Sequence, residues 1–349
     1  MKIDYRSDTV TRPTPAMLER MITAEVGDAV FGDDPTVHAL EGFAAEMFGM
    51  DAALFCPSGT MSNQIAIKVH TRPGDQMICD RTAHVYLYEG GGAALHSGVT
   101  CRLLDGVGGC FTAADVGAVI QPDDPHFPRT RLVSIENTSN KGGGTCWDVA
   151  EIRRIRALCD EHGLRLHLDG ARLFNALVAT GEPPSTFGEL FDSISICLSK
   201  GLGAPVGSVL LGDEAFIRDA DRMRKVYGGG MRQAGYLAAA GLHALEHHVE
   251  RLAVDHAHAV RLSEALAASR WPGKALPAMT NIVLYECDDA ETARSMIEDL
   301  AANDIHVVSM GETLVRLVTH LDISPEMIDR TVELVAGRAL LSKRAASVG

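Results

Sequence analysis

Between residues 52 and 211, short apolar runs alternate with segments whose apolar residues recur at helical spacing. The runs at 76–80, 164–168 and 194–198 have the length of buried strands and are bounded by turn residues. The segment 148–162 carries apolar residues three and four positions apart, which is typical of a helix packed on one side. This alternation predicts an α/β fold in which a mostly parallel sheet carries helices on both faces.

After this alternating region the pattern changes to long helices, and the chain ends in a shorter mixture of strands and helices. We therefore expect an N-terminal arm over residues 1–15, a large domain over 16–250 and a small α+β C-terminal domain over 251–349. A chain of 349 residues is long enough to build two such domains, each with its own core.

Charge and cysteine content exclude several classes of function. The formal net charge is −14, so we expect no cationic surface for nucleic acid. No apolar stretch reaches membrane-spanning length, and the first residues lack the apolar region of a signal peptide. The eight cysteines form no Cys-x-x-Cys pair and are expected to be reduced thiols. These features favour a cytoplasmic protein, and we expect no metal site.

A lysine, Lys200, stands between the apolar run 194–198 and a glycine-rich loop. At the end of a buried strand its backbone would be held rigidly, and Gly201 and Gly203 would leave room around its amine. This setting suits a Schiff-base lysine, because desolvation lowers the pKa of the amine and frees its lone pair. A lone Lys-Gly is more often a surface lysine in a loop, so the assignment needs a second feature.

The second feature is Asp169, which follows the strand predicted at 164–168 and precedes a helix. Open α/β sheets bind ligands at the carboxyl ends of their strands. Pyridoxal phosphate (PLP) requires an acid to pair with its pyridinium nitrogen and a lysine to hold its aldehyde. An aspartate at a strand end is often only a helix N-cap. Together, however, Asp169 and Lys200 predict a PLP site.

Three further features could complete such a site. Ser58, Gly59 and Thr60 begin a helix after a strand, where free N–H groups attract phosphate, although an ordinary helix cap is equally consistent. The glycine pattern there is not G-x-G-x-x-G, which disfavours a nicotinamide dehydrogenase. His84 follows the strand at 76–80 and could stack on a flat cofactor or be a loop histidine. Arg316, in an apolar strand, could bind a substrate carboxylate or be a solvent-exposed edge residue.

Eight motifs occur in a specific order along nearly the whole chain. They are RSDTVT (6–11), GDDPT (32–36), PSGTMSN (57–63), HFPRT (126–130), IENT (135–138), LDGAR (168–172), SKGLGAPVGS (199–208) and GGGMRQAG (228–235). In these motifs the chain resembles the L-threonine aldolases of the low-specificity type. That resemblance implies the aspartate-aminotransferase fold (PLP fold type I) and a PLP cofactor.

The resemblance also implies roles for particular residues. The catalytic residues would be Lys200, His84, His126 and Asp169, with Lys200 holding the cofactor aldehyde, Asp169 its pyridinium, and His126 near the substrate β-hydroxyl. The cofactor would further contact Ser58, Gly59, Thr60, Arg172 and, from a neighbouring subunit, Lys225 or Arg232. The substrate would contact Ser7, Arg172 and Arg316, and lie near Phe31. Phe31 departs from the tyrosine usual in the family, and Ser139 stands where we would expect histidine.

The reaction implied is retro-aldol cleavage of L-threonine, L-allo-threonine or another β-hydroxy-α-amino acid to glycine and an aldehyde. The base could be His84 or His126. The family also implies a homo-oligomer, with a tetramer expected and active sites shared between subunits. A β-eliminating lyase, dehydratase or aminotransferase would use the same Lys200 and Asp169. A non-catalytic PLP-binding regulator would carry an added basic domain, and no such domain is recognisable.

Overall fold

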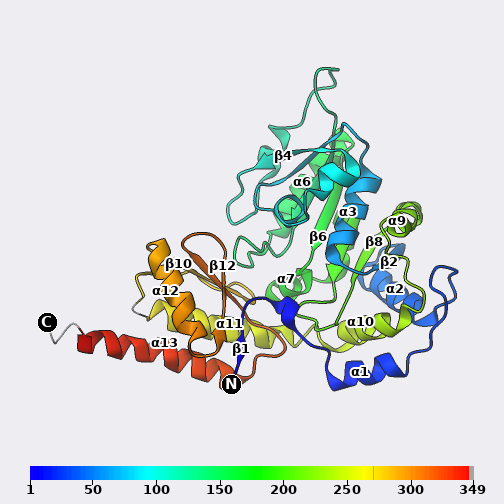
Figure 1. Ribbon diagram of the computed structural model, residues 1–349. Helices are drawn as coiled ribbons and strands as arrows, with labels where there is room; N and C mark the ends of the chain where they lie inside the picture. The colour runs from blue at the N-terminus through cyan, green and yellow to red at the C-terminus, as the bar shows by residue number, and fades with distance from the viewer. Residues whose placement is uncertain (270, 346–349) are drawn as a thin grey trace.

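The computed structural model describes residues 1–269 and 271–345 (Figure 1). A large domain surrounds a seven-stranded sheet, and a small domain surrounds a four-stranded sheet. Figure 1 shows the two domains side by side, with the helices α12 and α13 of the small domain on the side away from the large sheet.

The large sheet confirms the predicted α/β class. Its strand order is β2-β8-β7-β6-β5-β3-β4. β8 runs antiparallel to both of its neighbours, whereas the other neighbouring strands pair in parallel. The strands are β2 (Ala52–Cys56), β3 (Gln76–Asp80), β4 (Thr100–Leu104), β5 (Thr130–Glu136), β6 (Arg165–Gly170), β7 (Ser193–Cys197) and β8 (Ser208–Gly212).

Helices cover both faces of this sheet. The largest apolar cluster lies on one face, where the strands pack on α2 (Pro35–Phe48), α6 (Val149–His162), α7 (Leu173–Thr180), α8 (Pro184–Leu190) and α10 (Gly235–His247). Smaller clusters lie on the opposite face, beneath α3 (Gly59–His70) and α9 (Glu214–Val226). This domain also contains the short α-helices α1 (Pro15–Ile22), α4 (His84–Leu87) and α5 (Ala113–Gly117) and the π-helix η2 (Ala93–Ser97).

The central strands carry different side chains on their two faces. In β6, Leu166 and Leu168 join the large apolar cluster, whereas His167 and Asp169 point to the face covered by α3 and are fully buried. In β7, the buried serines Ser193 and Ser195 alternate with isoleucines in the same way. A strand with period-two alternation places its polar side chains on one face. The α3 face of the sheet is therefore lined by buried polar groups that lead toward the strand ends.

The small domain contains an antiparallel sheet of order β12-β13-β10-β9. Its elements are α11 (Leu252–Ala267), β9 (Gly273–Ala275), β10 (Ile282–Cys287), α12 (Ala290–Ala301), β11 (Ile305–His306), β12 (Val308–Ser309), β13 (Leu314–Val318) and α13 (Pro325–Ala345). The predicted N-terminal arm is not free. Its strand β1 (Ile3–Asp4) pairs in parallel with β11, and Ile3 and Tyr5 are buried in the small domain's core.

The helix α2 begins at Pro35, and Asp34 is its N-cap. The Asp34 carboxylate accepts the backbone N–H groups of Thr36 and Val37 at 3.2 and 3.1 Å. A proline at the first helical position is favourable because its nitrogen has no hydrogen to satisfy.

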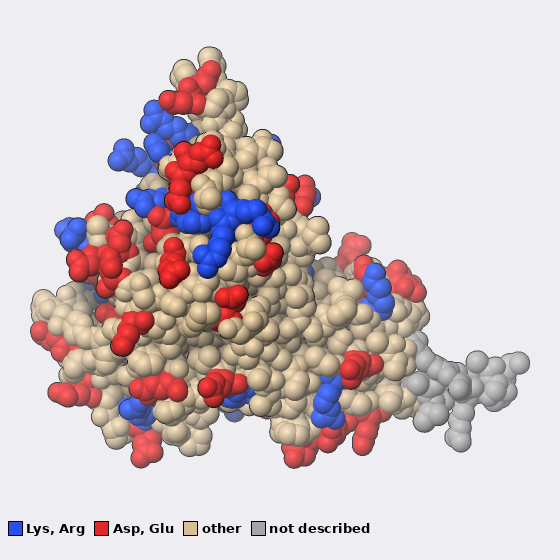
Figure 2. All heavy atoms as spheres, turned by 180° about the vertical axis from the view of Figure 1, so that it is seen from behind, with Lys and Arg blue, Asp and Glu red and all other residues tan. Residues whose placement is uncertain are grey.

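Figure 2 shows acidic side chains spread over most of one face, whereas basic ones gather in a band below the apex of the large domain. All eight cysteines are free thiols. Within residues 1–269 and 271–345, no helix has the length and apolar character needed to cross a membrane.

Candidate active site

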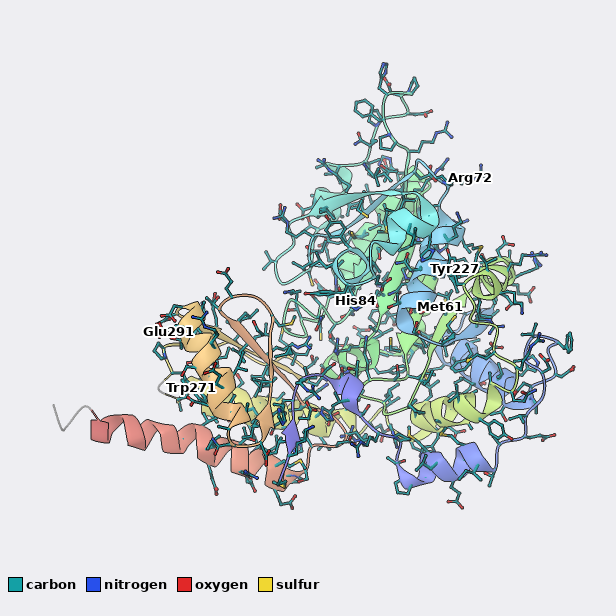
Figure 3. All side chains as sticks on the ribbon, in the orientation of Figure 1. Met61, Arg72, His84, Tyr227, Trp271 and Glu291 are labelled. Atoms are coloured by element: carbon teal, nitrogen blue, oxygen red, sulfur yellow. The ribbon has the colours of Figure 1, made fainter. Side chains whose placement is uncertain are left out.

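A cavity of about 440 Å³ lies where the carboxyl ends of the large sheet face the small domain. Figure 3 shows His84 on the side of the large domain that faces the small domain. The cavity is lined by Ser7, Thr9, His84, Tyr88, Asn140, Lys141, Arg172, Lys200, Val308, Ser309, Met310 and Arg316. It therefore collects side chains from the N-terminal arm, from loops that follow large-sheet strands, and from the β12–β13 segment.

Asp169, near the end of β6, is almost fully buried. Its Oδ1 atom accepts a hydrogen bond from the backbone N–H of Ala171 at 3.1 Å. Its Oδ2 atom is buried and has no hydrogen-bond partner among the described residues. An unpartnered buried carboxylate oxygen is costly. This atom therefore suits a cationic N–H donor such as the pyridinium nitrogen of PLP.

Lys200 stands three residues beyond the end of β7 and lines the cavity. Its backbone is held in place, because its carbonyl accepts hydrogen bonds from the Thr11 hydroxyl at 3.0 Å and from the Gly203 N–H at 2.9 Å. Gly203 has a φ of +83°, a conformation that glycine adopts without strain. The loop thus holds the backbone of Lys200 in a fixed position from which the amine extends, as the sequence predicts.

The first turn of α3 could hold the phosphate of the cofactor. Ser58 is the N-cap, and its Oγ accepts the backbone N–H of Met61 at 3.2 Å. The N–H groups of Gly59 and Thr60 have no hydrogen-bond partner among the described residues. A Cβ atom at Gly59 would lie 2.5 Å from the Cys197 sulfur, so a larger residue would not fit. Free N–H groups and the helix dipole together favour an anion at this turn.

His84 begins α4 and is fixed at two points. Its backbone N–H donates to Glu136 Oε2 at 2.8 Å, and its Nδ1 lies 2.9 Å from Glu89 Oε1. The Glu89 side chain is completely buried and also accepts from the amides of Asn63 and Gln64, at 2.9 and 2.6 Å. Because these amides donate to it, Glu89 is held as an acceptor, and the proton of the His84 contact belongs to Nδ1.

This environment changes the pKa of His84. Burial lowers the pKa of the imidazole, but the hydrogen bond to Glu89 and the negative charges of Asp169 and Glu89 outweigh burial and raise it above its usual value. The three side chains lie close together, with one ligand-type atom of each within 4.8 Å of the others. In a PLP site the two carboxylates of this group would lie near the cationic ring nitrogen of the cofactor instead of binding a metal ion.

Glu136 is a second buried carboxylate beside Asp169, and the sequence analysis did not identify it. The two residues are register partners at the ends of β5 and β6. Burial and the nearby charge of Asp169 raise the pKa of Glu136 to about 7, although hydrogen bonds from the Asn140 and His84 backbones oppose this. Its carboxylate accepts those N–H groups at 2.9 and 2.8 Å. Glu136 thus positions His84 and the turn that carries Asn140.

Arg172 forms a buried, bidentate ion pair with Asp8. Its Nε and Nη2 atoms donate to the two carboxylate oxygens at 2.7 Å each. Burial disfavours the charge on Asp8, but the Arg172 guanidinium and its hydrogen bonds hold the pKa of that carboxyl well below its usual range. Asn281 adds a further donor at 3.2 Å. The fork of Arg172 predicted to grip a substrate is therefore occupied by Asp8, which leaves only the rest of the guanidinium for a ligand.

Arg316, on β13, forms no salt bridge with any described residue. Its Nη1 donates to Asn140 Oδ1 at 2.6 Å and its Nη2 to the Arg6 carbonyl at 2.9 Å, and both acceptors are neutral. Its Nε is buried without a partner among the described residues. Burial and the nearby Arg172 lower the pKa of Arg316 to about 10. A buried guanidinium that meets only neutral acceptors is a ready site for a carboxylate.

Comparisons with known proteins agree with this geometry. A family profile described as beta-eliminating lyase matches residues 4–290. The low-specificity L-threonine aldolase of Escherichia coli K12 is 44% identical, over 93% of this chain and 96% of the relative. The chain belongs to the low-specificity L-threonine aldolase family. An Arabidopsis thaliana member is 40% identical over 95% of this chain and 94% of its own. The Leishmania major threonine aldolase structure has the same fold, with a TM-score of 0.84, 24% identity and coverage of 96% and 99%.

Eight residues to which the aldolase resemblance assigns a role do not line the cavity of a single chain. Four of them, Ser58, Gly59, Thr60 and Asp169, are described above, and the other four lie on exposed parts of the surface. His126 precedes β5 on an exposed loop, where its ring pairs with Asp124 and its side chain is 85% exposed. Phe31 is 76% exposed, and the Arg232 guanidinium lies 5.6 Å from its ring. Lys225 is exposed in the last turn of α9. Their roles stay predictions that require a second subunit.

The two departures from the family pattern do not reach the cavity of this chain. Phe31 lies on the exposed surface described above. Ser139 is buried in a turn, where its backbone N–H bonds to the Thr145 carbonyl at 3.0 Å and its Oγ accepts the Gly142 N–H at 3.1 Å. Neither side chain shapes the cavity within one aldolase subunit.

The sequence analysis missed residues of two kinds. Thr9, Tyr88, Asn140 and Lys141 line the cavity themselves. Asp8, Glu89 and Glu136 do not line it but form hydrogen bonds with residues that do. Glu136 could have been found by the reasoning used for Asp169, because both end buried strands of the same sheet. Glu89 could not, because its complete burial and its contacts with Asn63 and Gln64 arise only when its loop packs against α3.

Proposed function

We propose that this protein binds PLP and cleaves L-threonine, L-allo-threonine and other β-hydroxy-α-amino acids into glycine and an aldehyde. The names of its relatives support this reaction, since they are low-specificity L-threonine aldolases. The observation that carries the proposal is Arg316, a buried guanidinium with only neutral partners beside Lys200 in one cavity. It is placed to receive the α-carboxylate of an amino acid.

The residues present fit PLP at four points. Lys200 would hold the aldehyde carbon, and the unpartnered Oδ2 of Asp169 would accept the ring N–H. The free N–H groups of Gly59 and Thr60 would bind the phosphate, and the His84 ring would lie against the cofactor ring. When bound, PLP supplies an electron sink for the bond broken at the substrate Cα.

Arg316 would select which bond of the substrate breaks. A guanidinium that holds the α-carboxylate fixes the rotation about the bond between the carboxyl carbon and Cα, and with it the direction of the Cα–Cβ bond. Asn140 and the Arg6 carbonyl fix the guanidinium itself. Ser7 and Thr9 also line the cavity, and their hydroxyl groups could donate to the second carboxylate oxygen.

His84 is our candidate for the base that accepts the β-hydroxyl proton. Because Nδ1 donates to Glu89, only Nε2 is free to accept a proton. The contact with Glu89 raises the proton affinity of the ring, which favours acceptance of a hydroxyl proton. His126 could take this role only in a cavity to which another subunit contributes, because its side chain is exposed within one chain.

We further propose a homo-oligomer, with a tetramer expected, and a cytoplasmic location. Lys225, Arg232 and Phe31 support shared sites, because all three are exposed beside the loop that follows α9. The Ala29 N–H donates to the Arg232 carbonyl at 2.9 Å, so the two exposed loops form one surface. The eight free thiols support a reducing compartment.

Product analysis tests the reaction directly. Purified protein is incubated with PLP and either L-threonine or L-allo-threonine, and acetaldehyde, glycine and 2-oxobutyrate are assayed. Equal amounts of acetaldehyde and glycine are expected, and their loss in the Lys200→Ala variant. An aldolase activity that persists in this variant contradicts the assignment of Lys200.

The second candidate is a β-eliminating lyase or dehydratase. It is favoured by one specific observation, the match of residues 4–290 to the beta-eliminating lyase family, because Lys200 and Asp169 would serve both reactions. Elimination would release 2-oxobutyrate from threonine without glycine. The same product assay therefore distinguishes the two functions.

A further inference from the structure

Lys141 is a cation of the active-site cavity to which the proposed reaction assigns no part. It lines the cavity together with Lys200, Arg172 and Arg316, and none of the described residues that line it is acidic. Lys200 would hold the cofactor, and Arg316 would hold the α-carboxylate of the substrate. The fork of Arg172 is occupied by Asp8. Lys141 is therefore available for another part of the substrate.

The contacts of Lys141 leave its positive charge uncompensated. Its Nζ donates to the Met310 carbonyl at 2.6 Å and lies 5.9 Å from the centre of the Tyr88 ring. Both partners are neutral, and Lys141 forms no salt bridge with any described residue. An ammonium group has three donors, so hydrogen bonds remain available for a ligand. A charge-assisted bond to an anion is stronger than one to a neutral acceptor, which favours an anionic group at this point.

Lys141 lies on the side of the cavity where the substituent of the substrate β-carbon is expected. The ring of His84, our candidate base for the β-hydroxyl, lies 5.6 Å from the Tyr88 ring, and Lys141 lies against the same tyrosine. The hydroxyl and the substituent are bonded to one carbon. A hydroxyl held at His84 therefore places the substituent in the part of the cavity that Tyr88 and Lys141 line.

The position of Lys141 relative to Arg316 is fixed by the residue between them. The Asn140 side chain accepts the Arg316 guanidinium at 2.6 Å, and the Asn140 backbone N–H donates to Glu136 at 2.9 Å. The acceptor of Lys141 is also held, because the Met310 N–H forms a backbone hydrogen bond of 2.8 Å across the β12–β13 connection. The two cations are thus arranged for a molecule with two carboxylates, one at each of them.

We propose that Lys141 binds an anionic group on the β-carbon, so that the substrates include β-hydroxy-α-amino acids whose side chain carries a carboxylate. This inference rests on the proposed aldolase reaction. β-Hydroxyaspartate is the smallest such amino acid. Its Cα–Cβ bond would break, the β-hydroxyl proton would pass to the base and a proton would be added at Cα, which gives glycine and glyoxylate. Threonine would still be accepted, because Val308 and Met310 also line the cavity and can contact its methyl group.

The test is to compare kcat/KM of the PLP-loaded protein for the threo and erythro forms of L-β-hydroxyaspartate with kcat/KM for L-threonine and L-allo-threonine. We expect glycine and glyoxylate in equal amounts from at least one form of β-hydroxyaspartate. Added salt should lower the ratio of its kcat/KM to that of threonine, because salt screens the charge of Lys141. Cleavage of threonine without cleavage of either form of β-hydroxyaspartate overturns this inference and leaves the aldolase proposal intact. No glycine from any of the four substrates overturns both.

The decisive variant is K141Q, in which the side chain keeps an N–H donor but carries no charge. The ratio of kcat/KM for β-hydroxyaspartate to kcat/KM for threonine should fall by roughly tenfold or more, because a hydrogen bond to a charged group contributes on that scale. K141R keeps the charge and should retain most of the ratio.

The control is K274Q. The Lys274 ammonium lies 3.0 Å from Glu286 on the exposed surface of the small domain, so its loss should leave the ratio unchanged. If Lys141 served only to hold the β12–β13 segment or the α-carboxylate, K141Q would lower kcat/KM for both substrates by the same factor. An unchanged ratio in K141Q therefore contradicts the proposal.

Discussion

The two buried arginines of the active site differ in their counter-charges. Arg172 has a fully buried carboxylate partner in Asp8, whereas Arg316 meets only neutral acceptors. Removing one member of a buried ion pair leaves the other charge buried and unpaired, which is costly. Removing an unpaired buried charge also removes the free-energy cost of having taken that charge out of water. The two residues should therefore respond differently to the same substitution.

We predict that Arg316→Gln raises the KM for L-threonine by about tenfold to a hundredfold, since a charged hydrogen bond contributes about 1.5–3 kcal/mol. Its thermal stability without substrate should be equal to, or above, that of the unmodified protein. Steady-state kinetics and thermal unfolding check both parts. A large loss of stability together with an unchanged KM would assign Arg316 to structure instead of substrate binding.

The control for this experiment is Arg172→Gln, which breaks the pair with Asp8. It should lower the free energy of unfolding by about 3–5 kcal/mol, because it leaves the Asp8 carboxylate buried without its charge partner. Denaturant unfolding of the two variants side by side separates the roles. Equal destabilisation of both would contradict the distinction drawn from their partners.

At the same scale, Glu89 controls the proton affinity of His84. Its contact and its charge raise the pKa of the imidazole against the opposing effect of burial. We predict that Glu89→Gln lowers this pKa, because the amide keeps the hydrogen bond but not the charge. A base is active in its deprotonated form, so the acidic limb of the kcat/KM profile should move to lower pH.

The pH dependence of kcat/KM with L-threonine measures this shift. Glu246→Gln is a suitable control, because Glu246 is an acid of α10 outside the cavity. Its acidic limb should stay in place. An acidic limb that does not move in Glu89→Gln would mean that His84 is not the group whose titration limits the reaction.

At the scale of elements, a buried hydrogen-bond chain lies between α3 and the sheet. His70 Nε2 and His167 Nδ1 each lie 2.8 Å from the Ser193 hydroxyl. His167 Nε2 lies 3.2 Å from Asn63 Oδ1, and the Asn63 amide donates to Glu89. Because Asn63 uses its donor on Glu89, its oxygen must accept from His167, which fixes the tautomer of that ring. The polar face of β6 and β7 thus supports the active site through α3.

Burial holds both histidines of this chain neutral. It lowers the pKa of His167 to about 3 and that of His70 to about 4. The unfolded chain binds protons at these positions below about pH 6.5, whereas the folded chain does not. The folded state is therefore destabilised as pH falls from about 6.5 toward 4. The expected slope is about 1.4 kcal/mol per pH unit for each histidine.

We predict that His167→Gln reduces the loss of stability between pH 7 and pH 5. Glutamine can still bond to Asn63 and Ser193 but has no group that titrates in this range. Urea unfolding at both pH values gives the slope for the variant and the unmodified protein. His126→Gln is the control, because His126 is exposed and should leave the slope unchanged. An unchanged slope in His167→Gln would show that His167 is not neutralised by folding.

Strand and helix positions in the large domain could be predicted because their apolar periodicity is local. The strand Gln76–Asp80 is found where the pattern places it, and Ser193–Cys197 lies one residue from the predicted run 194–198. The pairing of β1 with β11 could not be predicted, because nothing in a two-residue strand specifies a partner 300 residues away. The role of Glu89 was missed for a different reason, because burial of a carboxylate is a property of the packed structure.

At the scale of the whole molecule, the cavity joins both domains and the arm, but it lacks several residues that the family resemblance assigns to it. Lys225 and Arg232 are exposed in one chain, as are His126 and Phe31. Closed, symmetric oligomers allow an exposed residue of one subunit to complete the site of another. If this holds, a subunit that lacks Lys200 can still contribute Lys225 to a neighbour.

We therefore predict that mixing two inactive variants restores activity. Lys200→Ala removes the residue that holds the cofactor, and Lys225→Ala removes a cation proposed to reach the cofactor of a neighbouring subunit. When equal amounts are dissociated and reassembled together, roughly a quarter of the sites should combine an intact Lys200 with an intact Lys225 from a neighbour. The activity should rise toward that fraction.

A mixture of Lys200→Ala with Asp169→Ala is the control. Both residues lie in the same chain near one cavity, so each hybrid site still requires both of them from one subunit. Recovery in the first mixture and none in the control would establish shared sites, whereas no recovery in either would mean that Lys225 acts within its own chain or not at all.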